Sequence, residues 1–382
     1  MSAFEIVHDG LGFKLQNPAD FMLIEPFIFA CAGAVTIAVS YCACLYAAQA
    51  RRVLDHPNER SSHTSATPRN GGSAIMAGWV AGAFVVSAFA GDADAAGKLA
   101  RLAVCGGLAF ALGYADDHLT FSPIWKLVGQ VAIAALFTIL FAPLQSVPLP
   151  WFGEVAIPAA VSVPITILWI AGFMNAFNFM DGANGMAGGA AAVGLAWFAV
   201  IASFTGAPAL AVAALLLALS AASFLPENLL RGKLFMGDNG SQALGFFIAA
   251  FAVLGVNWTG GRLSALVIPV IFLPFLFDVA WTLVSRFLRK QNVLEAHREH
   301  FYQLMMRLGA SHARVSIVYM SLISFSSAAA ILMLTHPATL HWMTPLVLSL
   351  VFTIGAVAIY RPAMRAGLLA SAEPDASFSA AE

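Results

Sequence analysis

The stretch LFMGDNGSQALG, residues 234–245, places the charged Asp238 between glycines at the start of a long apolar run. A carboxylate at a membrane boundary is costly unless something pairs with it, so a cation or the charged part of a substrate is the expected partner. Oxygen-rich surroundings with no cysteine and few imidazoles favour a hard cation, and Mg²⁺ held partly by substrate phosphates fits best. We therefore predict Asp238 to be a metal ligand.

The sequence outside this stretch is typical of an integral membrane protein. Of its 382 residues, 60% are hydrophobic and 10% are charged, whereas a soluble domain has roughly 25% charged residues. The formal net charge of -1 gives no indication of nucleic-acid binding. The four cysteines lie in apolar runs without a zinc-binding spacing, which argues against a disulfide framework. Residues 1–25 lack the charged start of a cleavable signal peptide.

Eleven apolar runs are long enough to cross a bilayer, because a spanning helix needs about 20 such residues. They cover approximately residues 26–48, 71–90, 98–115, 124–142, 158–175, 184–204, 207–225, 240–257, 263–285, 315–335 and 343–360. We therefore predict an all-α integral membrane protein, a polytopic bundle of about 11 transmembrane helices. Residues 1–25 are expected outside the membrane, residues 26–365 as one transmembrane catalytic domain, and residues 366–382 as a disordered tail.

The placement of lysine and arginine sets the predicted orientation, because basic loops stay on the cytoplasmic side. With the N-terminus outside, all but four of the 19 Lys and Arg residues fall in inside loops, the exceptions being Lys14, Lys98, Arg101 and Arg262. An odd number of spans places the C-terminus in the cytoplasm. Since the inside loops also carry the polar clusters, function is expected on the cytoplasmic face.

The first two inside loops combine cations and acids. In the first, His63 and Arg69 lie among prolines and glycines that favour a turn, and we interpret them as phosphate or nucleotide contacts. A plain positive-inside anchor would also explain the arginines. In the second, Asp116 and Asp117 repel each other, so a metal, a basic neighbour or a raised pKa is expected, with a solvated helix end as the alternative. Lys126 starts the next span, either as a phosphate counter-ion or as a snorkelling lysine.

The third and fourth inside loops carry amides and an acid. Asn175, Asn178 and Asp181 follow one another at i, i+3 spacing on one helix face. This stripe is expected to line a polar cavity, although asparagines can also bridge helices inside a bundle. Asn228 and Phe235 come shortly before the GDNG turn, where flanking glycines let a ligand approach the backbone closely.

The fifth inside loop is the longest and most basic, and it contains AHREHFYQ with His297 and His300 at i, i+3 spacing. Too few ligands are present for zinc. Imidazoles beside Arg298 are interpreted as pH-sensitive donors to phosphate, with an amphipathic interfacial helix as the alternative. Asp278 lies inside the ninth span and is expected to face the bundle interior, with Arg286 as its partner.

These clusters together supply the groups of a metal-assisted phosphoryl transfer between a water-soluble and a lipid substrate. The chain resembles the polyprenyl-phosphate N-acetylhexosamine-1-phosphate transferases over residues 55–314, in five motifs that occur in the same order: DHPNERSSHTSATPRNGG, GYADDHLTFSPIWKLVGQ, NAFNFMDGANGMAGG, LFMGDNGSQALGF and the HREH loop. The resemblance implies transfer of a sugar 1-phosphate from a UDP-N-acetylhexosamine to undecaprenyl phosphate with release of UMP. It also implies a Mg²⁺ requirement and a multi-pass location in the bacterial inner membrane, with a periplasmic N-terminus.

The resemblance also implies roles for single residues. Asp238 matches the family's Mg²⁺ ligand, Phe235 would stack on uracil, and Asn228 would hydrogen-bond it. Asp116 and Asp117 resemble the acidic pair proposed to act as a base on the lipid phosphate or to help hold the metal.

Two further motifs carry implied substrate contacts. The stripe of Asn175, Asn178 and Asp181 matches the pattern near the nucleotide and diphosphate. His297 and His300 resemble the histidine motif that contacts the diphosphate or the sugar. Direct attack of the lipid phosphate on the β-phosphorus is the expected route, and a double displacement through a phosphorylated aspartate is the alternative.

The chain departs from the family pattern at two points. Asn184 stands where a second aspartate is common, and HREH replaces HxHH or HHH. The HRxHxYQ pattern resembles the branch that initiates O-antigen synthesis, whose donors include 6-deoxy-N-acetyl sugars. A phospho-N-acetylmuramoyl-pentapeptide transferase of peptidoglycan synthesis and a polytopic lipid-linked transporter stay open as alternatives, and a homodimer is compatible with the sequence.

Overall fold

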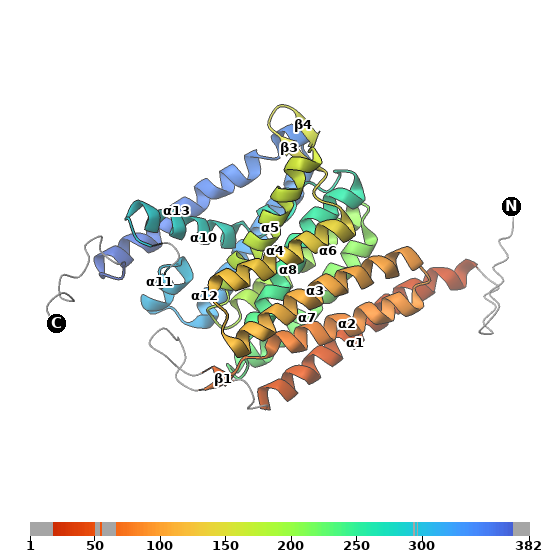
Figure 1. Cartoon of the computed structure of the whole chain (residues 1–382), viewed down its shortest axis with the longest axis horizontal. Coiled ribbons are helices and arrows are strands. Elements are labelled where there is room, and N and C mark those ends of the chain that lie inside the picture. Colours follow the sequence, from red (N-terminus) through yellow and green to blue (C-terminus); the bar gives the residue numbers. More distant parts are fainter. Residues whose placement is uncertain (1–17, 50–53, 56–65, 293–294, 296, 370–382) are drawn as a thin grey trace.

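The computed structural model describes residues 18–369 except 50–53, 56–65, 293–294 and 296, and these form a helical bundle with two small hairpins (Figure 1). The elements in chain order are α1 (Pro18–Gln49), β1 (Leu54–Asp55), β2 (Thr67–Pro68), α2 (Gly71–Phe89), α3 (Ala93–Leu119), α4 (Pro123–Phe141), β3 (Ser146–Leu149), β4 (Gly153–Ala156), α5 (Ala159–Phe179), α6 (Met186–Phe204), α7 (Pro208–Leu225), η1 (Pro226–Leu230), α8 (Asp238–Thr259), α9 (Val267–Ile271), α10 (Leu273–Leu288), α11 (Phe301–Arg307), α12 (His312–Leu334), η2 (Ala338–Leu340) and α13 (Met343–Arg365). The predicted outer segment and tail fall largely outside the described residues, at 1–17 and 370–382.

The architecture confirms the predicted all-α polytopic class. Within the described residues, ten helices are long and apolar enough to cross a membrane. The predicted span 263–285 is different, because it consists of the short α9 and of α10, which meet at Phe272. Pro274 has no N–H to donate, and its ring crowds the carbonyl one turn before it, which favours the break between α9 and α10. The ninth predicted span is therefore a broken helix.

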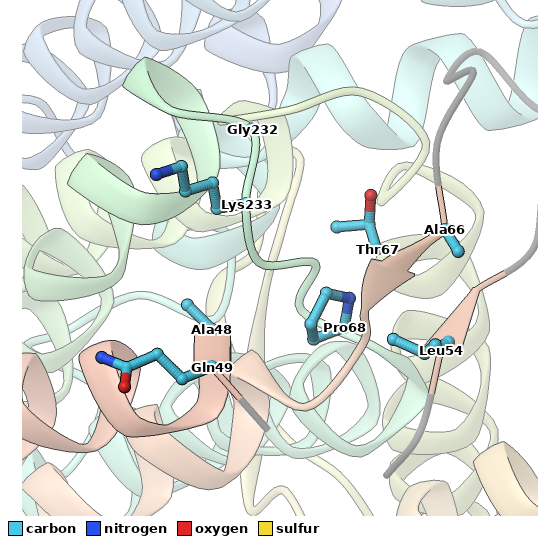
Figure 2. Close-up of a pocket in the computed structure, with 8 residues that line it drawn as sticks. All are labelled: Ala48, Gln49, Leu54, Ala66, Thr67, Pro68, Gly232 and Lys233. Carbon is cyan, nitrogen blue, oxygen red and sulfur yellow. The ribbon is translucent and has the colours of Figure 1, made fainter. Parts of the chain in front are cut away.

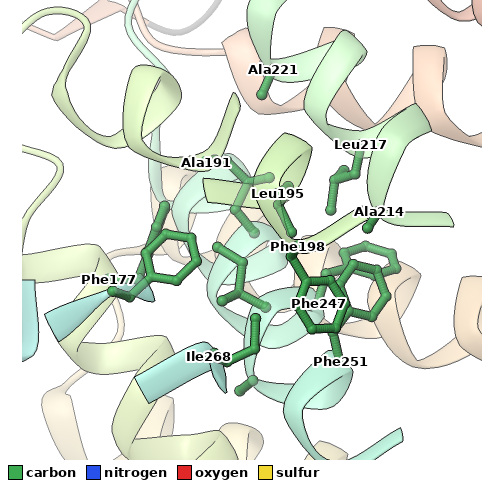
Figure 3. Close-up of a cluster of buried hydrophobic side chains, with 14 of the residues drawn as sticks. Phe177, Ala191, Leu195, Phe198, Ala214, Leu217, Ala221, Phe247, Phe251 and Ile268 are labelled. Carbon is green, nitrogen blue, oxygen red and sulfur yellow. The ribbon is translucent and has the colours of Figure 1, made fainter. Parts of the chain in front are cut away.

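Helix α8 is the centre of the bundle and is buried along its length. The Phe247 ring packs against Trp79 of α2 with centroids 4.6 Å apart, and Phe251 stacks on Phe198 of α6 at 5.8 Å. Small side chains such as Ala191 and Ala214 let α6 and α7 approach this aromatic cluster closely (Figure 3). Because α8 is enclosed on all sides, the position of its first residue, Asp238, is fixed by the core.

Several helix ends meet at the N-terminus of α8. Asp116 and Asp117 lie in the last turn of α3, one turn further into a helix than the predicted loop. A side chain at Gly113 would place its Cβ 2.2 Å from the backbone oxygen of Asp238, so only glycine allows α3 to approach this closely. The Phe235 N–H donates to Pro68 O at 2.7 Å, which joins the chain before α2 to the chain before α8.

The other small hairpin lies at the opposite end of the bundle from β1 (Figure 1). Strands β3 and β4 pair antiparallel between α4 and α5. The Trp342 indole donates to Pro148 O at 2.6 Å and ties this hairpin to the start of α13. The polar groups at the start of α8 lie away from this hairpin, at the end of the bundle that holds β1 and β2 (Figure 1).

Candidate functional site

Asp238 lies where four segments of the chain meet. Its Oδ2 is 2.5 Å from Lys126 Nζ on α4, and its Oδ1 accepts a hydrogen bond from Asn178 Nδ2 on α5 at 3.1 Å. Arg69 Nη2 lies 3.7 Å from Oδ1. The Asp238 side chain is 22% exposed, so the carboxylate is held in a defined orientation and is still accessible to a ligand.

The Lys126 ammonium group joins Asp116 to Asp238. Its Nζ is 2.8 Å from Asp116 Oδ2, so one ammonium group is shared by the carboxylates of Asp116 and Asp238. The remaining oxygen, Asp116 Oδ1, accepts a hydrogen bond from the Phe121 N–H at 2.8 Å. The basic neighbour expected for the acidic pair is therefore present, and it serves Asp116.

Asp117 has different partners from its neighbour in sequence. Its side chain is fully buried, and Oδ1 lies 2.7 Å from Arg69 Nη2. The carboxylate also accepts the backbone N–H groups of Asp238 and Asn239 at 3.0 and 3.1 Å. These are otherwise unpaired donors at a helix N-terminus, where a negative charge is favourable. Asp117 therefore orients α8 and Arg69, and a catalytic role for it stays a prediction.

Asp181 lies in the turn after α5 and is half-buried. Its backbone N–H donates to Asn178 O at 3.1 Å, which places the side chain beside the same cluster. Burial raises the pKa of this carboxyl well above its usual range, and the negative charge of Asp238 adds to the rise, against a smaller opposing effect of Arg69. An acid with a raised pKa can hold a proton nearer to neutral pH than an ordinary carboxyl group can.

Asn175 is half-buried and lies in a layer of amides one turn from Asn178 along α5. Its Nδ2 donates to Gln130 Oε1 at 2.6 Å, and Gln130 Nε2 donates to Gln242 Oε1 at 2.9 Å. Gln130 and Gln242 are fully buried. Gln130 follows Lys126 by four positions, and Gln242 follows Asp238 by four positions. This spacing places each glutamine on the same helix face as a site residue, and it is visible in the sequence. Asn175 thus bridges α5 and α4, as the alternative interpretation expected, and its contact with substrate stays a prediction.

Asn228 and Phe235 both organise backbone near the site. Asn228 is buried, its Oδ1 accepts the Gly185 N–H at 2.5 Å, and its Nδ2 donates to Leu234 O at 2.8 Å. The backbone oxygen of Phe235 accepts the Gly71 N–H at 2.9 Å. The predicted contacts of the two side chains with uracil stay predictions.

The histidine motif lies against the turn that carries Asp181. The His300 ring is buried and stacks on Phe179 with centroids 6.2 Å apart. The Tyr302 hydroxyl donates to Phe179 O at 3.1 Å. Burial, together with the neighbouring His300 and Arg286, lowers the pKa of His297 to about 4. His297 is therefore neutral near pH 7, and its predicted role as a pH-sensitive donor to phosphate stays a prediction.

The predicted pairing of Asp278 with Arg286 is wrong. Arg286 Nη1 instead lies 3.0 Å from Glu299 Oε1, and Arg289 also pairs with Glu299. Asp278 Oδ1 lies 3.1 Å from His300 Nδ1. Two other predicted substrate contacts remain. Arg298 is half-buried next to Glu299 in the sequence, and His63 lies outside the described residues. Glu299 thus anchors the histidine motif to α10 at a position where the family pattern has an imidazole.

The donor atoms around Asp238 suit a magnesium ion that keeps other ligands. Within the described part of the chain, no group of three or more His, Cys, Asp or Glu side chains can hold a metal ion by itself. Mg²⁺ is commonly bound by one or two carboxylates together with substrate phosphates and water. Asp116 and Asp238 are two carboxylates that already share one cation, so the residues present fit this mode of binding.

A pocket of about 570 Å³ opens next to the segments that hold Arg69 and Phe235. Gln49 at the end of α1, Thr67 and Pro68 on β2, and the Lys233 side chain contribute to its lining (Figure 2). Lys233 is the charged residue of this lining, so the pocket wall carries a positive charge.

Comparisons with known proteins find a matching family model and several relatives. Residues 99–256 match the family model described as glycosyl transferase family 4. The chain is 31% identical to a probable undecaprenyl-phosphate N-acetylglucosaminyl 1-phosphate transferase of Bacillus subtilis, over 71% of this chain and 74% of the relative. It is 29% identical to a decaprenyl-phosphate N-acetylglucosaminephosphotransferase of Mycobacterium tuberculosis, over 72% and 75%. A phospho-N-acetylmuramoyl-pentapeptide-transferase of Staphylococcus haemolyticus is 28% identical over 50% and 63%.

Proposed function

Because this chain belongs to the polyprenyl-phosphate hexosamine-1-phosphate transferase family, we propose that it transfers N-acetylhexosamine 1-phosphate from a UDP-sugar to undecaprenyl phosphate and releases UMP. The observation that carries the proposal is the convergence of Asp116, Lys126, Asn178 and Asp238 from the four helices α3, α4, α5 and α8. Acids, a fixed amide and a cation are the groups that a phosphoryl transfer requires.

In the proposed reaction, an oxygen of the lipid phosphate attacks the β-phosphorus of the donor. A new P–O bond forms there while the bond to the departing UMP breaks. Lys126 and Arg69 bind the phosphate oxygens and offset their charge. Asn178 keeps Asp238 in orientation, and Asp116 accepts a proton from the lipid phosphate. Mg²⁺ bound at Asp238 would supply further neutralisation of the diphosphate charge.

The cellular setting is part of the same proposal. We assign the chain to the inner membrane with its site on the cytoplasmic face, because most Lys and Arg residues fall in loops at the end where the site lies. The product would start O-antigen or a related cell-envelope polysaccharide. The N-acetylglucosaminyl relatives cover more of the chain than the muramoyl-pentapeptide relative does, which favours a simple N-acetylhexosamine donor.

The test is UMP release by purified protein with undecaprenyl phosphate and a panel of UDP-sugars, including UDP-N-acetylmuramoyl-pentapeptide. We expect UMP with an N-acetylhexosamine donor and none with the pentapeptide donor. Asp238→Asn should reduce turnover at least a hundredfold, as expected for removal of a group that acts on the transition-state charge. Asp94→Asn is the matched control, because Asp94 is an exposed carboxylate near the other end of α3. Near-normal turnover of folded Asp238→Asn protein with Mg²⁺ would contradict the assignment.

A further inference from the structure

The turn between α5 and α6, residues 180–185, is held at both backbone groups of one residue by side chains from α12. The Asn184 N–H donates to His312 Nδ1 at 3.1 Å, and the Ser316 hydroxyl donates to Asn184 O at 2.6 Å. Backbone groups of a connecting turn are ordinarily left to water at the surface. Here two side chains of one helix bind them instead.

The two side chains of α12 match the two groups that they hold. His312 and Ser316 are at i, i+4 spacing, so they lie on the same helix face. An imidazole nitrogen that accepts an N–H carries no proton, and a hydroxyl that faces a carbonyl donates. The start of α12 is itself fixed, because the Ser311 hydroxyl oxygen accepts the Arg314 N–H at 3.3 Å. His312 and Ser316 therefore form a clamp on Asn184.

The clamped turn carries an acid of the site. The Asp181 N–H donates to Asn178 O at 3.1 Å, and Asn178 Nδ2 donates to Asp238. The charge of Asp238 acts on the Asp181 carboxyl, so the two acids lie near each other. At the other end of the turn, the Gly185 N–H donates to Asn228 Oδ1 at 2.5 Å. The place of Asp181 beside Asp238 therefore depends on α5 at one end of the turn, and on α12 and η1 at the other.

We propose that His312 and Ser316 are positioning residues of the site, which act on the reaction through the turn that carries Asp181. Without the clamp, the backbone groups of Asn184 are free to turn to water, and the turn can take up shapes in which Asp181 is displaced from Asp238. A displacement of about 1 Å at a reacting site lowers turnover strongly. This inference rests on the proposed function, since the turnover concerned is the transfer of the sugar phosphate.

The test measures hydrogen exchange of the turn and UMP release by the purified protein at about pH 8, where an ordinary imidazole is neutral. His312→Leu removes the acceptor, whereas His312→Asn keeps an acceptor oxygen in the place of Nδ1. We expect faster exchange of the turn amides in His312→Leu than in the wild type, and a kcat/KM lower by about tenfold, the worth of one hydrogen bond. His312→Asn should restore the wild-type values of both.

Two serines of α12 supply a matched pair of variants. Ser316 and Ser327 are both fully buried, but the Ser327 hydroxyl donates to Ile323 O within its own helix. Ser316→Ala should lower turnover, and Ser327→Ala should leave it unchanged. When His312→Leu and Ser316→Ala are combined, the loss should be well below the product of the two single losses, because either change releases the same turn.

Three results would overturn the inference. They are unchanged turnover in His312→Leu, equal losses in His312→Leu and His312→Asn, and equal losses in the two serine variants. If the wild-type chain releases no UMP, the proposed transfer fails, and the exchange rates still decide whether α12 holds the turn. Equal exchange in His312→Leu and the wild type would show that it does not.

Discussion

At the scale of single residues, two neighbouring aspartates have different partners because they lie on different sides of α3. Asp117 is enclosed and satisfies the first N–H groups of α8. Asp116 is slightly exposed and shares the Lys126 ammonium with Asp238. Removing one partner of a buried, hydrogen-bonded charge pair typically costs about 3–5 kcal/mol. The effect of replacing Asp117 should therefore appear first in folding, and that of replacing Asp116 in turnover.

His297 gives a pH-dependent prediction at the same scale. Its pKa in the folded chain is lowered to about 4. In the unfolded chain a histidine has its ordinary pKa of about 6.5. The unfolded state therefore binds more protons between these two pH values, and the stability of the fold decreases as the pH falls from about 6.5 to about 4. His297→Gln should make the thermal midpoint fall less steeply across this window.

The control for this prediction is His118→Gln, which removes an exposed imidazole at the end of α3. Its melting profile should keep the slope of the wild-type chain. Identical slopes for His297→Gln and the wild type between pH 6.5 and pH 4 would show that His297 is not the group responsible.

At the scale of elements, the site is built from the ends of helices that share deeper contacts. Gln130, Asn175 and Gln242 connect α4, α5 and α8 one turn below the charged groups. Each of these helices also carries a charged or amide group of the site one turn nearer its end. The amide layer therefore fixes how the three helices are rotated relative to one another, and with that the spacing of Lys126, Asn178 and Asp238.

Gln130→Leu tests this coupling. The variant removes the donor to the buried Gln242 Oε1 and the bonds between Gln130 and Asn175, and an unsatisfied buried polar group costs about 1–3 kcal/mol. We expect a lower thermal midpoint and a turnover reduced by more than tenfold, because Lys126 and Asp238 are no longer held in register. Thr138→Val on the same helix is the control, since that hydroxyl bonds only to its own helix, at Ala135 O. Equal effects of the two variants would mean that the amide layer has no special role.

The predicted membrane spans agree with the long helices of the structure at all but one run. Long apolar runs give ten of the eleven predicted spans, because length and hydropathy suffice for a helix in a bilayer. The ninth run fails this criterion because Pro274 interrupts the hydrogen-bond ladder inside it. Hydropathy does not register a proline that lies between apolar neighbours. The break at Phe272 could be predicted only from the missing backbone N–H of Pro274.

At the scale of the whole molecule, the convergence of distant polar clusters was predictable and their individual contacts were not. Motifs on the same predicted side of the membrane had to meet at one end of the bundle, and Arg69, Lys126 and Asp238 do so. The partner of Asp278 depended on how the chain from α10 returns to α11, which spacing along the sequence does not determine. Likewise, the hydrogen bonds between Asn175 and Gln130 on α4 could not be predicted from the spacing of residues along α5.

The central claim is that the carboxylates at this end of the bundle hold a metal-bound diphosphate. The most direct measurement is the affinity of the purified protein for UDP, by calorimetry, with and without Mg²⁺. We predict that Mg²⁺ tightens UDP binding to the wild type and to Glu154→Gln, which changes an exposed acid on the β4 hairpin at the opposite end. In Asp238→Asn this effect of Mg²⁺ should disappear. An undiminished Mg²⁺ effect in Asp238→Asn, or its loss in Glu154→Gln, would contradict the account.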